Sequence, residues 1–109
     1  MDARNMRRAF FAGLVSGLRV VWPILSVLVG AMLVMGFVIG RIEGWGLGDS
    51  AYFAFVSGLT IGYGDLVPKS LVSRLLAICI GLSGILLTGL VAAVAVRALE
   101  AAATREPAQ

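Results

Sequence analysis

Two long runs of residues without a charge dominate the hydrophobic pattern of this chain. They cover residues 20–39 and 75–96. A helix of about twenty residues spans roughly 30 Å, the thickness of the hydrocarbon core of a bilayer. Neither run carries the polar stripe of a surface helix in a globular protein. The pattern therefore predicts two membrane-spanning helices, over residues 20–40 and 73–98, with Pro23 in the first turn of the first helix, where its missing N–H costs little.

Basic residues surround a short apolar patch, residues 9–18, before the first run. They are Arg4, Arg7, Arg8 and Arg19. This arrangement predicts an amphipathic segment over residues 1–19 that lies in the membrane interface. A secretory signal peptide is the alternative, but the apolar run from Val20 is too long for its hydrophobic region.

The segment between the two spans, residues 41–72, divides into two parts. A glycine-rich stretch over residues 40–48 cannot hold regular structure for long. Asp49 and Ser50 then offer an N-cap for an apolar, aromatic helix at about residues 50–59. Such a helix spans only about half of the hydrocarbon core, so the segment must enter the membrane and return. Irregular backbone at that depth must face protein or a watery cavity and not lipid.

The six residues after this short helix are Thr60-Ile61-Gly62-Tyr63-Gly64-Asp65. Two glycines at alternate positions allow φ values of both signs, so that successive carbonyl groups can point to one side. One chain supplies only a line of oxygens. Four such lines around an axis would form stacked rings that replace the water shell of a cation.

This six-residue motif, between two spans and behind a half-helix, resembles the selectivity filter of potassium channels. The whole arrangement is similar to the two-transmembrane prokaryotic potassium channels, from about residue 20 to residue 99. The resemblance implies that the filter residues bind potassium through backbone carbonyls at Thr60, Ile61, Gly62 and Tyr63, with the Thr60 hydroxyl at the inner end. It also implies that Gly64 turns the chain outward and that Asp65 lies at the outer mouth.

The resemblance also assigns supporting roles to the half-helix. The aromatic ring of Tyr63 is expected to brace the filter against this helix, with Ser57 as its nearest hydrogen-bond partner. Tyr52 is expected to donate a hydrogen bond to Asp65. Val56 stands where some relatives have a glutamate behind the filter, so a buried acid partner of Asp65 is missing.

The second span places small and apolar residues on one continuous face, at three- and four-residue steps. Gly84 is a gating hinge by the resemblance, or alternatively a site of close helix contact. Ile85, Thr88, Ala92 and Val96 are candidate pore-lining residues. A helix-packing stripe is the competing interpretation of the same face.

Composition and charge narrow the class of protein. Hydrophobic residues make up 60% of the chain and charged residues 14%, which is atypical of a soluble domain. There is no histidine, and Cys79 is the single cysteine, so a Cys/His metal cluster is excluded. An enzyme is disfavoured because no nucleophile has a neighbouring base. Apart from potassium ions in the filter, no cofactor is expected.

The positive charges predict the orientation and the partners. The two ends carry six of the nine Lys and Arg residues, which places both termini in the cytoplasm of a cell with the protein in its inner membrane. Residues 99–109 then form a short cytoplasmic tail. The expected partners are three identical subunits, forming a homotetramer, and anionic membrane lipids; neither nucleic acid nor a small-molecule substrate is expected. Two alternatives stay open: a non-selective Na⁺/K⁺ channel of the same architecture, and a non-conducting membrane adaptor.

Overall fold

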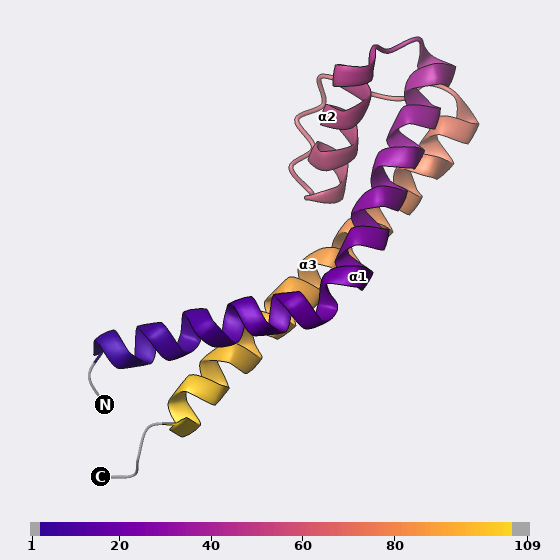
Figure 1. Cartoon of the computed structure of the whole chain (residues 1–109). Helices are drawn as coiled ribbons and strands as arrows, with labels where there is room; N and C mark the ends of the chain where they lie inside the picture. Colours follow the sequence, from indigo (N-terminus) through magenta and orange to yellow (C-terminus); the bar gives the residue numbers. More distant parts are fainter. Residues whose placement is uncertain (1–2, 106–109) are drawn as a thin grey trace. The chain divides into compact units, whose positions relative to one another are not determined.

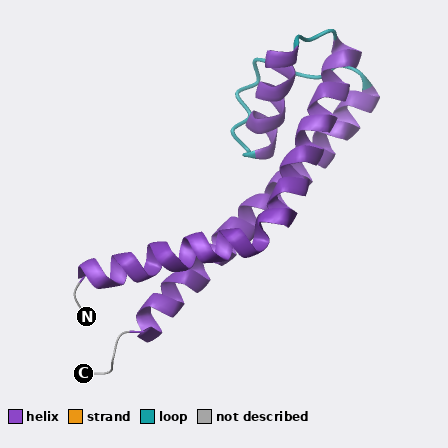
Figure 2. Cartoon of the chain, viewed as in Figure 1, coloured by secondary structure: helices purple, strands orange, loops and turns teal. Residues whose placement is uncertain are grey.

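Three helices account for most of the chain in the computed structural model, which describes residues 3–105. They are α1 (Ala3–Glu43), α2 (Leu47–Gly58) and α3 (Leu71–Arg105) (Figure 1). Figure 2 shows that all other described segments are loops. Helices α1 and α3 are long and apolar enough to cross a membrane. The expected all-α class with two long apolar helices is confirmed for the described residues.

Helix α1 continues through the boundary expected at residue 19. The interfacial segment and the outer span therefore belong to one helix of 41 residues. The expectation that Pro23 lies in a first turn is wrong, because the helix begins twenty residues earlier and Pro23 is in its interior. Its missing N–H leaves the carbonyl of Arg19 without an intrahelical donor.

The turn after α1 is shorter than the glycine pattern suggests. Gly44 adopts a left-handed conformation with φ of 77°, and the amide of Trp45 donates to the carbonyl of Gly40 at 2.8 Å. This is the Schellman arrangement that ends a helix on a glycine. This turn occupies only residues 44–46, between the end of α1 and the start of α2. Most of residues 40–48 are therefore helical.

Helix α2 begins at Leu47 with Gly46 as its N-cap, so the expected cap at Asp49 or Ser50 is wrong. Asp49 lies in the first turn, where a carboxylate still favours the positive end of the helix. The buried hydroxyl of Ser50 instead donates to the carbonyl of Gly46 at 2.8 Å. An N-cap side chain accepts a hydrogen bond from a backbone amide of the first turn. The Ser50 hydroxyl instead donates to a carbonyl four residues earlier, so it does not cap the helix.

The chain divides into two compact units, one of residues 25–88 and one of residues 1–24 with 89–109. In the first unit, four buried side chains from all three helices form the core: Met32, Ile39, Phe53 and Ile80. The Trp45 ring packs on Phe53 at a centroid distance of 5.0 Å. In the described part of the second unit, α3 buries Val94, Ala98 and Ala102.

Candidate functional site

Glycines on both long helices allow a close approach to α2. A Cβ at Gly36 of α1 would lie 2.8 Å from the Cβ of Ala54, and one at Gly40 would overlap the hydroxyl of Ser50. On α3, a Cβ at Gly84 would overlap the carbonyl group of Gly58, the last residue of α2. Since only glycine fits at these contacts, the position of α2 is set by backbone on both sides.

The end of α2 holds the start of the six-residue motif through main-chain hydrogen bonds. The carbonyl of Val56 accepts from the amides of Ile61 at 2.9 Å and Gly62 at 3.2 Å. The carbonyl of Ser57 accepts from the amide of Thr60 at 3.2 Å. These bonds satisfy carbonyls that have no partner within the helix. Val56, whose side chain is buried, thus supports the motif through its backbone.

Every second residue of the motif has a left-handed backbone. The φ angles are 61° at Thr60, 57° at Gly62 and 82° at Gly64. The two glycines use the positive φ that they were expected to allow, and Thr60 extends the alternation to a third position. A β-branched residue at positive φ is a strained conformation. The Thr60 hydroxyl donates to the adjacent carbonyl of Leu59 at 2.6 Å.

All six residues of the motif are exposed in the single chain. Alternation of left-handed and right-handed backbone lets successive carbonyl groups point to one side of the chain. The backbone carbonyls of residues 60–63 are therefore the groups that could ligate a desolvated cation. One chain supplies one side of such a site.

The outer end of the motif is tied to α2 by a side-chain contact. The Tyr52 hydroxyl donates to Oδ2 of Asp65 at 2.9 Å, which is the contact expected from the sequence. The expected bond between Tyr63 and Ser57 is absent among the described residues. Tyr63 is 69% exposed in the single chain.

Glu43, which the sequence analysis did not single out, links the end of α1 to the start of α3. Its carboxylate accepts hydrogen bonds from the backbone amides of Lys69 and Ser70. These two amides stabilise the ionised form and lower the pKa of Glu43 below its ordinary value. Glu43 lies beyond Arg41, outside the charge-free span. A partner 26 residues away leaves no local signal in the sequence.

A second missed contact fixes the chain between the motif and α3. Nε of Arg74 donates to the carbonyl of Pro68 at 3.2 Å, and Pro68 is buried. The loop that follows the motif is therefore attached to α3 by Arg74 and to α1 by Glu43.

On α3, the structure separates Gly84 from the candidate pore-lining residues. Gly84 is buried against α2. Ile85, Thr88, Ala92 and Val96 are all exposed in the single chain. Gly84 thus makes a close helix contact, as its second interpretation expected, with Gly58 of α2. The four pore-lining candidates lie on a surface of α3 that the single chain leaves exposed.

Comparison with known proteins identifies the family. The family model described as an ion channel matches residues 24–101, which include both long helices, α2 and the motif. The chain belongs to this ion channel family. Membership in this family, with two helices long enough to cross a membrane, points to a membrane channel and away from an enzyme.

Two relatives with curated names are potassium channels. The chain is 52% identical over 44 residues to the two-pore potassium channel 1 of Arabidopsis thaliana, covering 40% of this chain and 12% of that protein. It is 41% identical over 54 residues to the intermediate conductance calcium-activated potassium channel protein 4 of Rattus norvegicus, covering 50% and 13%. The matched segments are thus about an eighth of the length of these relatives. No solved structure matches the chain significantly.

Proposed function

We propose that this chain is the pore subunit of a potassium-selective channel that conducts K⁺ passively across the cell membrane. The observation that carries the proposal is the left-handed backbone at Thr60, Gly62 and Gly64, held against the last carbonyls of α2. Membership in the ion channel family and the potassium channels among its relatives support it. In this proposal residues 60–65 are the selectivity filter.

The proposed assembly is a homotetramer with the architecture of the two-transmembrane prokaryotic channels. One line of carbonyls cannot enclose an ion, whereas four lines around an axis form rings. Ile61 and Tyr63 are 48% and 69% exposed in the single chain. Three further copies would cover these apolar side chains and brace the filter from outside.

Each part of the site has a task in this mechanism. Carbonyls of residues 60–63, with the Thr60 hydroxyl at the inner end, replace the hydration shell of K⁺, and repulsion between neighbouring ions lets them leave. Four Asp65 carboxylates concentrate cations at the outer mouth. Helix α2, as a re-entrant pore helix, directs the negative end of its dipole toward the cavity below the filter. Ile85, Thr88, Ala92 and Val96 line the path beyond it.

The bilayer placement follows the charges. The charge-free segment between Arg19 and Arg41 crosses the hydrocarbon core, with both termini on the cytoplasmic side. Anionic lipids complement the basic ends.

Ion flux from liposomes tests the function. Liposomes with the purified protein should release K⁺ faster than Na⁺, and external Ba²⁺ should block the release. Gly62→Ala places a side chain at a φ of 57° and should abolish selective flux. Gly89→Ala is the matched control, because Gly89 lies within α3 without a positive φ and has open space around it.

Each outcome distinguishes the proposal from its alternatives. Equal K⁺ and Na⁺ flux would identify a non-selective cation channel. Absence of flux together with a monomeric mass would favour the membrane adaptor.

A further inference from the structure

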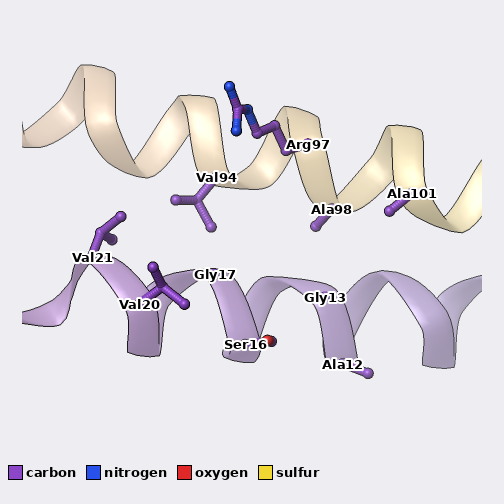
Figure 3. Close-up of a pocket in the computed structure, with 10 residues that line it drawn as sticks. All are labelled: Ala12, Gly13, Ser16, Gly17, Val20, Val21, Val94, Arg97, Ala98 and Ala101. Carbon is purple, nitrogen blue, oxygen red and sulfur yellow. The ribbon is translucent and has the colours of Figure 1, made fainter.

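Helix α3 is attached to other segments of the chain in two different ways. Near its C-terminus the attachment is close packing, because a Cβ at Gly17 of α1 would lie 2.6 Å from Cγ1 of Val94. Figure 3 shows Gly17 opposite Val94. In its first turn, by contrast, α3 is attached by polar groups to the loop that follows the six-residue motif. A single side chain can therefore change how this loop is held.

Arg74 makes two of the contacts between the first turn of α3 and this loop. Its amide donates to the carbonyl of Ser70 at 3.0 Å, and its Nε donates to the carbonyl of Pro68 at 3.2 Å. The second bond is partly buried, and Pro68 itself is buried. Because a buried carbonyl without a donor is costly, the Arg74 side chain stabilises the loop by satisfying this group.

The position of Arg74 is unfavourable for α3 itself. Arg74 is the fourth residue of a helix that begins at Leu71, and the first turn of this helix contains no acid. A positive charge near the N-terminus of a helix opposes the helix dipole. The contact with the loop, and not the stability of α3, therefore accounts for an arginine at this position.

The loop is short and stiff between Pro68 and the outer end of the motif. Two residues separate Pro68 from Asp65, and the three steps between them span at most about 10 Å. The backbone of Val67 is restricted to extended conformations because a proline follows it. Such a link passes a displacement of Pro68 on to Asp65 and to the bond between Asp65 and Tyr52.

We propose that Arg74 is a positioning residue of the proposed selectivity filter. By holding the Pro68 carbonyl, its Nε–H keeps Asp65 at the outer mouth and keeps the outermost carbonyl ring, at Tyr63, at the spacing that K⁺ requires. The donated hydrogen bond has this effect, and the positive charge of the side chain is not required for it. The inference rests on the proposed function, because it concerns the selectivity of residues 60–65 in the assembled channel.

Two substitutions of the same length separate the hydrogen bond from the charge. In Arg74→Gln the amide nitrogen lies the same number of bonds from Cα as Nε of arginine, so the donor is retained without the charge. In Arg74→Met a methyl group takes that place, and both are lost. We expect Arg74→Met to lower the ratio of K⁺ to Na⁺ permeability, read from bi-ionic reversal potentials, at least about fivefold, the weight of one hydrogen bond. Arg74→Gln should stay within about twofold of the parent protein.

Arg41→Met is the matched control for the loss of an arginine between the two spans. Arg41 is exposed in the last turn of α1 and donates to none of the described residues. The permeability ratio of this variant should stay within about twofold of the parent value. Thermal unfolding of each variant is measured alongside. A less stable Arg74→Met with an unchanged ratio would make Arg74 a structural contact alone and would overturn the proposal.

The hydrogen bond can also be measured in the parent protein, which keeps the proposal testable if Arg74→Met does not assemble. Exchange of the Nε–H proton with water is followed by NMR in lipid nanodiscs. This exchange should be at least about fivefold slower for Arg74 than for Arg41. Equal exchange rates would overturn the proposal.

Two further results on the variants would overturn it. An equal loss of selectivity in Arg74→Gln and Arg74→Met would assign the effect to the charge, and an equal loss in Arg41→Met would assign it to positive charge anywhere on this side of the membrane. A parent protein without preference for K⁺ would contradict the proposed function, and this inference with it. A selective parent protein with an equally selective Arg74→Met would overturn this inference alone.

Discussion

Replacement of Gly84 by alanine tests how α2 is positioned. The new Cβ would lie 2.5 Å from the Cα of Gly58 and closer still to the carbonyl of Gly58. An ordinary contact between carbon atoms is about 3.5–4.0 Å. Helix α2 or α3 must therefore move by about an ångström or more. Because Gly58 precedes Thr60 by two residues, this displacement reaches the six-residue motif.

The expected cost exceeds the gain in helix propensity. Alanine in place of glycine stabilises a helix interior by about 1 kcal/mol. Overpacking of a close contact costs about 1–3 kcal/mol, and more where the neighbour is backbone. We expect Gly84→Ala to be destabilised by about 1–2 kcal/mol in each chain and to lose part of its ion selectivity.

Two other glycines of α3 provide matched controls. Gly81 and Gly89 have no atom within 4 Å of an added Cβ in the chain. Their alanine variants should be at least as stable as the parent protein. Thermal unfolding of the reconstituted protein, measured together with K⁺ and Na⁺ flux, compares the three variants directly.

The reasoning is refuted if Gly84→Ala unfolds at the same temperature as Gly89→Ala and keeps its selectivity. A lower open probability as its single effect would instead support the hinge that the resemblance implies.

Three further predictions follow from the contacts of the site. Tyr52→Phe removes the hydrogen bond to Asp65 and should accelerate filter inactivation a few-fold; an unchanged decay of the macroscopic K⁺ current would contradict the role of this bond. Glu43 has a lowered pKa, so its contribution to stability is present above its ordinary pKa of 4.5 and is lost as the pH falls through the folded-state value below it. Glu43→Gln should therefore reduce the loss of thermal stability as the pH falls below 4.5, whereas an unchanged loss in acid would assign it to another group. Thr88→Cys, made in a Cys79→Ser background, should become sensitive to block of the K⁺ current by a cytoplasmic cationic thiol reagent; insensitivity would favour the packing stripe.

The sequence was sufficient for the features that depend on local patterns. The charge-free runs predicted two long apolar helices, and α1 and α3 contain them. The alternate glycines were expected to allow φ values of both signs, and Gly62 and Gly64 both have positive φ. A resemblance supplied the bond from Tyr52 to Asp65 across 13 residues, which no periodicity could have indicated.

The errors arose where tertiary contacts or a longer helix override local signals. Pro23 was placed in a first turn because the apolar run begins directly after Arg19. Helix α1 in fact begins at Ala3 and continues through both residues. Asp49 and Ser50 are common caps, but the Schellman turn at Gly44 brings the chain back early enough for Gly46 to take that place. The contact of Glu43 with residues 69 and 70 depends on two helix ends that meet only after folding.

The reversal potential under bi-ionic conditions tests the central claim most directly. A planar bilayer with the reconstituted protein separates equal concentrations of KCl and NaCl, and the potential at zero current is read. Carbonyl rings from residues 60–63 predict a large potential of the sign that marks K⁺ as the permeant ion. The same measurement on Gly62→Ala should give no such potential. A reversal potential near zero for the parent protein, with clear single-channel currents, would contradict a potassium-selective filter.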